Sequence, residues 1–175
     1  HTETNDIIPI LETMEAMASL IKSGKIKYYG LSNETPWGTS QYIKLADKHN
    51  IPKPITIQNP YSLINRSYEV GLSEISIREK IGLLAYSPLG GGHLTGKYLG
   101  GKKPAGTREV LWGNRFDRYR TRNTEPAVKA YYEVAKKHNI DPAQMAIQFC
   151  IIQKFVTSTI IGATSMEQLK KNIDS

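Results

Sequence analysis

Short apolar segments alternate with longer helical patterns along the chain, and this alternation constrains the fold more than any other feature. Each apolar segment has the length of a buried strand, and a helical pattern separates it from the next one. Such long connections join parallel strands, whereas antiparallel neighbours need only short turns. The sequence therefore predicts an α/β fold with a parallel sheet. The predicted strands are Ile26–Leu31, Ile55–Gln58, Ile81–Tyr86 and Phe155–Ile161.

Helical periodicity and capping residues define the segments between these strands. The first helical pattern runs from Ile10 to Ile21, before any strand. Thr35-Pro36 combines an N-cap with proline at the first helical position, so a helix is expected from there to about Asn50. The remaining helices are predicted over Tyr68–Lys80, from a cap at Thr124, from Asp141-Pro142 to about Gln153, and from Ser165.

The length of the chain limits how these units can be arranged. A complete (β/α)₈ barrel takes about 250 residues, and this chain has 175. Its four strand-helix units correspond to half of such a barrel. Two interpretations follow from the pattern: residues 1–175 are a single partial domain of a larger barrel, or they form a small open sheet with two edges.

Composition and cysteine usage argue against a membrane or secreted protein. Hydrophobic residues make up 39% of the chain, which is typical of a soluble domain. The longest near-apolar stretch, Ile81–Tyr86, is far shorter than the roughly 20 residues of a membrane helix, and no signal peptide is recognisable. A lone Cys150 in the apolar run Met145–Ile152 predicts core packing rather than a nucleophile. We expect a cytoplasmic protein without a membrane partner.

Positive charge is concentrated in one glycine-rich segment. The formal net charge is +7, and most of it lies between Lys97 and Arg122, where only Glu109 and Asp117 are acidic. A phosphate-bearing ligand, a solvated loop and a nucleic-acid surface all fit this pattern. Zinc-finger, homeodomain and RNA-recognition signatures are absent from the sequence, so we expect no nucleic-acid partner.

A near-match to a nucleotide-binding loop also lies here. Gly91 and Gly92 with Gly96-Lys97 have the glycine and lysine spacing of a phosphate-binding P-loop. That loop requires Ser or Thr next to hold magnesium, and then a helix, whereas this chain continues with Tyr98 and further glycines. The sequence therefore does not predict nucleotide-triphosphate hydrolysis.

Four segments follow one another at the spacing of barrel strands: Gly24–Asn33, Ile57–Arg66, Leu84–Gly90 with Thr95–Tyr98, and Ile161–Ser165 with Gln168 and Asn172. In this order they resemble the last four barrel strands of the aldo-keto reductases. The wording Gln58-Asn59-Pro60-Tyr61 is most similar to the Tas-like branch, which is related to potassium-channel β subunits. The resemblance covers nearly the whole chain and implies about strands 5 to 8 of a (β/α)₈ TIM barrel, that is, its C-terminal half. In the order given, the four segments match the fifth, sixth, seventh and eighth strands of the family's barrel.

The resemblance implies an NADP(H) cofactor at the C-terminal mouth of the barrel, where barrel enzymes place their sites. Ser32, Asn33 and Gln58 match family positions that hydrogen-bond the nicotinamide carboxamide. Tyr86 matches the aromatic residue against which the nicotinamide stacks. The alternative for the three polar residues is a purely local role at the ends of strands.

Further positions match contacts to the cofactor phosphates. Glycines permit close backbone approach to an anion, and backbone N–H groups can bind it. Lys97 matches a cationic phosphate contact, and for a nearby arginine we choose Arg115 over Arg118. The loop implied to pass under the pyrophosphate consists of Ser87, Pro88, Leu89, Gly90 and Gly91.

The start of the last helix matches the adenosine and 2′-phosphate contacts through Thr164, Gln168 and Asn172, where a helix N-terminus favours an anion. Ser165 and Gln168 also have the spacing of a capping box, which is the competing interpretation. Lys171 stands where relatives often carry glutamate, so an adenine amino contact is not assigned.

No catalytic residue and no metal ligand is assigned in this chain. The family's Asp-Tyr-Lys-His set, in which tyrosine protonates the carbonyl, belongs to the first half of the barrel. His1 lacks the Trp-Pro that follows the family histidine, and it fits an insertion better.

The function implied by the resemblance is NADPH-dependent reduction of aldehydes or ketones to alcohols. This chain would supply most of the cofactor site and would be inactive alone. The alternative is an NADP(H)-sensing module like the potassium-channel β subunits. The expected partners are a small carbonyl substrate and either the N-terminal half of the barrel or a second copy of the chain, because open sheet edges promote association.

Overall fold

A computed structural model describes residues 8–175, apart from the side chains of residues 114–116. Its central feature is a four-stranded parallel sheet in which each strand pairs with the next one along the chain. This order confirms the predicted α/β fold and the sequence of strand-helix units. The strands are β1 (Leu31–Ser32), β2 (Thr56–Pro60), β3 (Gly82–Tyr86) and β4 (Val156–Thr159).

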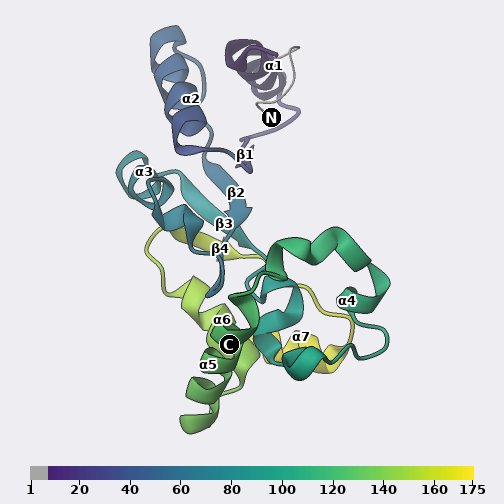
Figure 1. Cartoon of the computed structure of the whole chain (residues 1–175). Helices are drawn as coiled ribbons and strands as arrows, with labels where there is room; N and C mark the ends of the chain where they lie inside the picture. The colour runs from purple at the N-terminus through teal and green to yellow at the C-terminus, as the bar shows by residue number, and fades with distance from the viewer. Residues whose placement is uncertain (1–7) are drawn as a thin grey trace.

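Most of the longer helices form two groups, one toward each end of the molecule (Figure 1). Figure 1 shows α1 and α2 at one end of the molecule and α5, α6 and α7 at the other, with the sheet between them. Between β3 and α5 the chain forms only short helical segments. The longer helices are α1 (Ile10–Lys22), α2 (Pro36–His49), α3 (Leu72–Glu79), α5 (Thr124–Lys137), α6 (Pro142–Ile151) and α7 (Met166–Ile173); the short ones are η1 (Ser67–Glu69), η2 (Gly90–Thr95), η3 (Leu99–Gly101), α4 (Arg108–Leu111) and η4 (Gly113–Tyr119).

The two faces of the sheet differ in burial. Leu31, Ile57 and Leu83 share one row of the parallel register and are buried. In the next row Ser32 and Gln58 are exposed, because successive side chains of a strand point to opposite faces. Helices therefore cover one face, and the other is the face that a closed barrel turns inward. The core on the covered face also includes Ile43 of α2, Tyr61, Tyr68, Leu72 of α3, Ile81 and Cys150 of α6.

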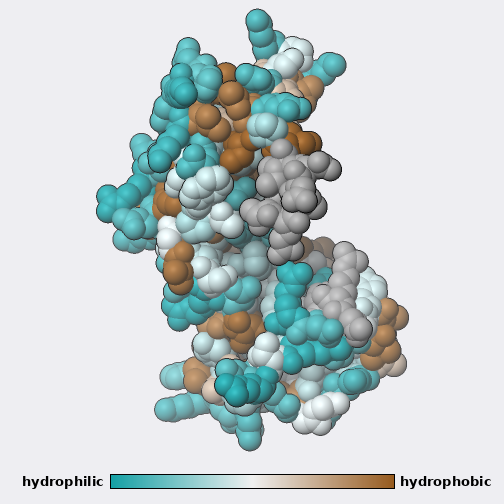
Figure 2. All heavy atoms as spheres, turned by 45° about the horizontal axis from the view of Figure 1, so that its top comes forward, coloured by the Kyte–Doolittle hydropathy of each residue, from teal (hydrophilic) through white to brown (hydrophobic). Residues whose placement is uncertain are grey.

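Apolar side chains also remain on the surface. Figure 2 shows hydrophobic residues gathered toward the end of the molecule that carries α1 and α2. Ile8, Tyr28 and Trp37, which lie on or beside these elements, are 65%, 67% and 67% exposed. No helix in the described part of the chain is long and apolar enough to cross a membrane.

Most element boundaries agree with the sequence to within about two residues, with three larger differences. The first strand begins at Leu31 rather than Ile26, although the Ile55 N–H donates to the Tyr29 carbonyl at 3.0 Å just before it. The helix expected over residues 68–80 is divided at Gly71, whose φ of 94° interrupts it. Thr124 does not cap a helix: it is the first residue of α5, and its hydroxyl bonds that of Thr121.

The predicted caps of three other helices are confirmed. Thr35 Oγ1 accepts from the Gly38 N–H at 3.0 Å, and Asp141 Oδ1 accepts from the Ala143 N–H at 2.9 Å. Ser165 Oγ accepts from the Gln168 N–H at 3.2 Å. Each satisfies an amide that the first turn of a helix leaves without a partner.

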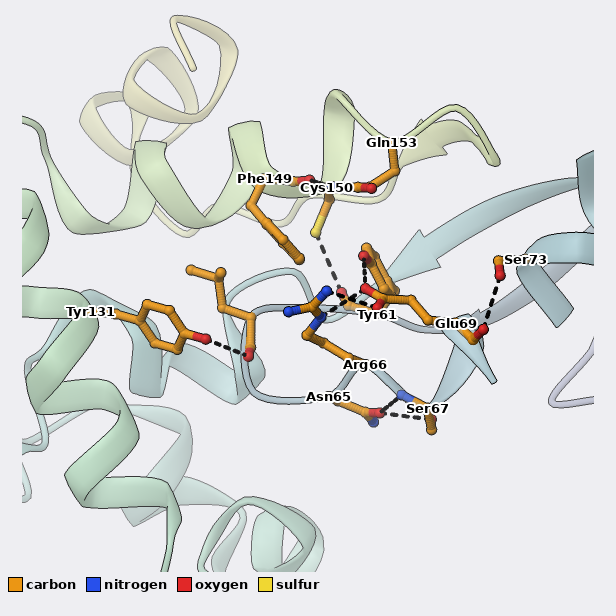
Figure 3. Close-up of polar contacts among 11 residues, drawn as sticks. Tyr61, Asn65, Arg66, Ser67, Glu69, Ser73, Tyr131, Phe149, Cys150 and Gln153 are labelled. Atoms are coloured by element: carbon orange, nitrogen blue, oxygen red, sulfur yellow. Dashed lines mark hydrogen bonds and ion pairs between the residues drawn. The ribbon is translucent and has the colours of Figure 1, made fainter. Parts of the chain in front are cut away.

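The loop after β2 is fastened to the covered face of the sheet (Figure 3). Tyr61 is fully buried and donates its hydroxyl proton to Glu69 Oε1 at 2.6 Å, while Arg66 binds both Glu69 oxygens at 2.7 and 2.8 Å. Arg66 also lies over the Phe149 ring of α6. Cys150 is fully buried beside the Tyr61 carbonyl, and burial raises the pKa of its thiol to about 12, which confirms its core role.

Candidate cofactor site

Polar and aromatic side chains converge where β1, β2 and β3 end. Ser32 and Gln58 are partners in the parallel register, and the Asn33 N–H donates to the Gln58 carbonyl at 2.9 Å. Tyr86, the last residue of β3, donates its hydroxyl proton to Asn33 Oδ1 at 2.7 Å. Asn33 has a φ of 53°, a conformation that asparagine tolerates better than most residues. The structure thus brings together the four residues assigned to the nicotinamide, which occupy the carboxyl edge of the sheet.

The loop after β3 turns sharply and packs against apolar side chains. Ser87 and Gly90 have positive φ values of 56° and 54°. A side chain at Gly90 would begin 2.5 Å from Ile64 Cδ1, so any other residue would have to displace Ile64 as well as adopt the positive φ. Pro88 and Gly91 are buried, and Leu89 packs on the cluster of Leu94, Val128 and Ala146. The Gly90 N–H already donates to the Ser87 carbonyl at 2.8 Å, which stiffens the turn.

Tyr119, near the C-terminal end of the glycine-rich segment, contacts the loop after β3. Its side chain is 3% exposed and lies 3.8 Å from the point where a Gly90 Cβ would stand. Burial raises the pKa of Tyr119, while a hydrogen bond with Ser87 acts in the opposite direction. The segment 97–122 therefore returns to the loop that follows β3.

The cations of this segment take different positions. Lys97 is exposed, with Nζ 5.2 Å from the Tyr98 ring centroid. Arg115 belongs to η4, but its side chain lies outside the described residues, and Arg118 is exposed. Arg108, which the sequence did not single out, places Nη2 3.3 Å from where a Gly162 Cβ would stand. The residues around Arg108 do not distinguish it from the other arginines in the sequence. The path of the whole loop decides which arginine lies beside the connection that follows β4.

Residues at the start of α7 mostly bind one another. The Thr164 N–H and hydroxyl both donate to Gln168 Oε1, at 3.0 and 3.1 Å. Asn172 is buried and donates through Nδ2 to the Gly162 carbonyl at 3.2 Å. Ser165 therefore caps α7, but the Gln168 side chain accepts from Thr164 rather than from the Ser165 N–H of a complete capping box. Lys171 pairs with Asp141 at 3.0 Å, which ties α7 to the start of α6.

The three histidines in the described part of the chain lie in helical segments or at their ends. His49 and His138 lie at the ends of α2 and α5. His93 lies in η2 near Glu109, and His1 is outside the described residues. Among the residues whose side chains the structure describes, no group of three or more His, Cys, Asp or Glu could hold a metal ion.

The arrangement suits a ligand that combines an amide, a flat ring and phosphates. Exposed amide and hydroxyl groups on Ser32, Asn33 and Gln58 can donate and accept hydrogen bonds at one edge of the sheet. Tyr86 supplies an aromatic ring beside them. A tight glycine turn follows, with cations farther along the segment. A nicotinamide dinucleotide has these chemical groups, and the residues present fit it.

Comparison with known proteins identifies a family and several relatives. The model of the aldo/keto reductase family matches residues 2–175. The chain is 54% identical over 174 residues to protein tas of Escherichia coli K12, covering 99% of the chain and 50% of that protein.

Two further relatives differ in their described roles. One is L-glyceraldehyde 3-phosphate reductase of Escherichia coli K12, 33% identical over 173 residues, which covers 95% of the chain and 49% of the relative. The other is a probable voltage-gated potassium channel subunit beta of Oryza sativa subsp. japonica, 31% identical over 168 residues, which covers 94% of the chain and 51% of the relative. The chain thus spans about half the length of these relatives.

Proposed function

The chain belongs to the aldo/keto reductase family, and from this premise we propose that it supplies most of the NADP(H) site of a barrel that reduces aldehydes or ketones to alcohols. The observation that carries the proposal is the convergence of Ser32, Asn33, Gln58 and Tyr86 at the carboxyl ends of three adjacent strands. In (β/α)₈ barrels this edge holds the active site.

Each group in the site has a task that follows from its chemistry. Ser32, Asn33 and Gln58 bind the carboxamide and so fix which face of the nicotinamide is presented to the substrate. Tyr86 stacks on the ring, and its hydrogen bond to Asn33 orients it. The bound cofactor supplies the hydride that reduces the carbonyl carbon. The proton donor belongs, in this proposal, to the half of the barrel that precedes this chain.

In this proposal the loop after β3 and the basic segment bind the cofactor phosphates. The backbone of Ser87–Gly91 would lie under the pyrophosphate, where glycines permit close approach to an anion. Lys97 and Arg108 are cations near that loop and near Gly162, respectively. We assign the 2′-phosphate to Arg108 together with Thr164, since a guanidinium binds phosphate through paired N–H donors. The site then prefers NADPH to NADH.

A second candidate function is NADP(H) sensing without significant turnover. The relative described as a potassium channel subunit beta favours it. Both functions use the same cofactor site, so only turnover separates them. Steady consumption of NADPH with a panel of aldehydes and ketones supports the reductase, whereas tight binding without consumption supports the sensor.

The proposal also includes cellular context. The free, buried Cys150 suits a reducing cytoplasmic compartment. Arg120 pairs with Glu109 and Asp117, and Arg108 lies over Trp112, so part of the basic segment is neutralised or stacked within the loop. These contacts disfavour a nucleic-acid surface.

The test is a titration of the natural full-length protein with NADPH, followed by nicotinamide fluorescence. We expect saturable binding that is weaker for NADH. Tyr86→Ala should weaken binding about tenfold through lost stacking, while Tyr86→Phe, which keeps the ring and loses the bond to Asn33, should weaken it less.

A duplex oligonucleotide is the control ligand in that titration. Tighter binding of the duplex than of NADPH, with the strong salt dependence of phosphate contacts, would contradict the proposal. So would a folded protein that binds no nicotinamide nucleotide.

A further inference from the structure

A partly buried charge cluster lies inside the basic segment, around Glu109 of α4. Glu109 of α4 has a side chain only 8% exposed, and its Oε1 forms an ion pair with Arg120 Nε at 2.9 Å. Its other oxygen, Oε2, lies 3.7 Å from His93 Nε2 and has no hydrogen-bond partner among the described residues. A carboxylate removed from water needs such compensation, so the Arg120 guanidinium is its main stabilising partner.

The Arg120 guanidinium connects α4 with η4 through all of its nitrogens. Besides Nε to Glu109, its Nη1 donates to Asp117 Oδ1 at 2.8 Å and its Nη2 donates to the Gly113 carbonyl at 3.0 Å. The fixed fork of the guanidinium makes this three-way connection possible, which a lysine could not reproduce. The pair of the buried Glu109 carboxylate with the half-exposed Arg120 guanidinium therefore links α4 to η4.

Glu109 and Arg108 are neighbours on α4 but meet different parts of the molecule. Glu109 borders a cavity of about 240 Å³ that His93, Tyr98 and Arg120 also line. Arg108 is not among the residues that line this cavity; its Nη2 lies near Gly162, in the connection from β4 to α7. Consecutive helical residues point about 100° apart, so fixing one fixes the direction of the other.

We propose that Glu109 is a positioning residue for Arg108, whose guanidinium it holds beside Gly162 by anchoring α4 to Arg120. This inference rests on the proposed function, in which Arg108 contacts the 2′-phosphate of NADPH. NADH has no 2′-phosphate, so loss of the anchor weakens NADPH binding and leaves NADH binding nearly unchanged. A merely structural role for Glu109 would weaken both nucleotides alike.

The experiment measures the dissociation constants of NADPH and NADH in the natural full-length protein and in Glu109→Ala, Arg108→Ala and the double variant. We expect Glu109→Ala to weaken NADPH binding about tenfold and NADH binding less than about twofold, as expected for a lost charged hydrogen bond. Because both residues act on one contact, Glu109→Ala should add nothing once Arg108 is replaced.

Two variants serve as controls for the anchor. Glu109→Gln keeps an oxygen that can accept from Arg120 Nε and should restore most of the NADPH preference. Asp117→Ala removes an exposed partner of the same guanidinium and leaves α4 anchored, so its nucleotide preference should match that of the unmodified protein. Circular dichroism spectra confirm that each variant is folded.

The outcomes separate this inference from the proposed function. Equal losses for both nucleotides in Glu109→Ala, or additive losses in the double variant, overturn the positioning role while Arg108→Ala still lowers the NADPH preference. An Arg108→Ala variant with unchanged preference overturns the 2′-phosphate assignment and the inference with it. A protein that binds neither nucleotide overturns the proposed function itself.

Discussion

At the scale of single residues, burial separates the titratable groups that anchor the loop from those on the surface. His93 is half-buried beside Glu109, and burial lowers the pKa of His93, with Arg120 and Lys97 acting in the same direction and Glu109 opposing them. Its imidazole is therefore neutral at pH 7. A neutral ring 3.7 Å from the carboxylate leaves Arg120 as the cation that pairs with Glu109.

The lowered pKa of His93 predicts a pH-dependent stability. In the unfolded chain His93 takes up a proton near its ordinary pKa of 6.5, whereas in the folded chain it does so only at lower pH. The unfolded state therefore binds more protons below about pH 6.5, and the free energy of unfolding falls as pH decreases through that range. Urea unfolding at several pH values should show a shallower decrease for His93→Gln than for the unmodified protein. Equal slopes would contradict this prediction.

At the scale of elements, short polar contacts join helices that the hydrophobic core does not connect directly. Asp141 caps α6 through the Ala143 and Gln144 N–H groups and also pairs with Lys171 of α7. Burial raises the pKa of Asp141, but the bonds from Lys171 and from the two amides together lower it overall. One carboxylate thus sets both the start of α6 and the position of α7, which carries Gln168.

Two substitutions separate these roles of Asp141. Asp141→Asn keeps the cap and loses the half-exposed ion pair with Lys171, and it should cost about 0–1 kcal/mol. Asp141→Ala also loses the cap and should cost about 1 kcal/mol more. The free energies of unfolding in urea provide the comparison. Equal costs for the two variants would show that the cap contributes nothing.

At the scale of the whole molecule, the chain is a sheet with helices on one face and two edge strands. Gln58 and Ser32 are exposed on the other face, and β1 and β4 each have one neighbour in the described chain. In a closed barrel both edges are paired. Relatives about twice as long fit such a closure.

The open edges predict association of the 175-residue chain when it is produced alone. Light scattering coupled to size-exclusion chromatography should show oligomers or unfolded material, because exposed strand edges and apolar faces promote pairing. Coexpression with the preceding half of a family barrel should convert the chain into a one-to-one complex. A stable, monodisperse monomer of 19.6 kDa would contradict this prediction.

Local patterns in the sequence determined the strand order, the caps at Thr35, Asp141 and Ser165, and the buried role of Cys150. Hydrophobic periodicity and capping act over a few residues, so they are legible without the fold. The carboxyl ends of the strands were predictable too, because parallel strands end at a common edge. The interruption of the predicted helix at Gly71 was not predicted, since the sequence does not reveal the φ of a single glycine inside a helical pattern.

Only the tertiary structure decided which distant side chains meet. Tyr86 and Asn33 are 53 positions apart and hydrogen-bond because β1 and β3 end together. Arg108, among several arginines of one loop, reaches Gly162, and Glu109 is buried with Arg120. Composition locates charge in a segment, but the path of a long loop determines which charge becomes buried and which reaches the site.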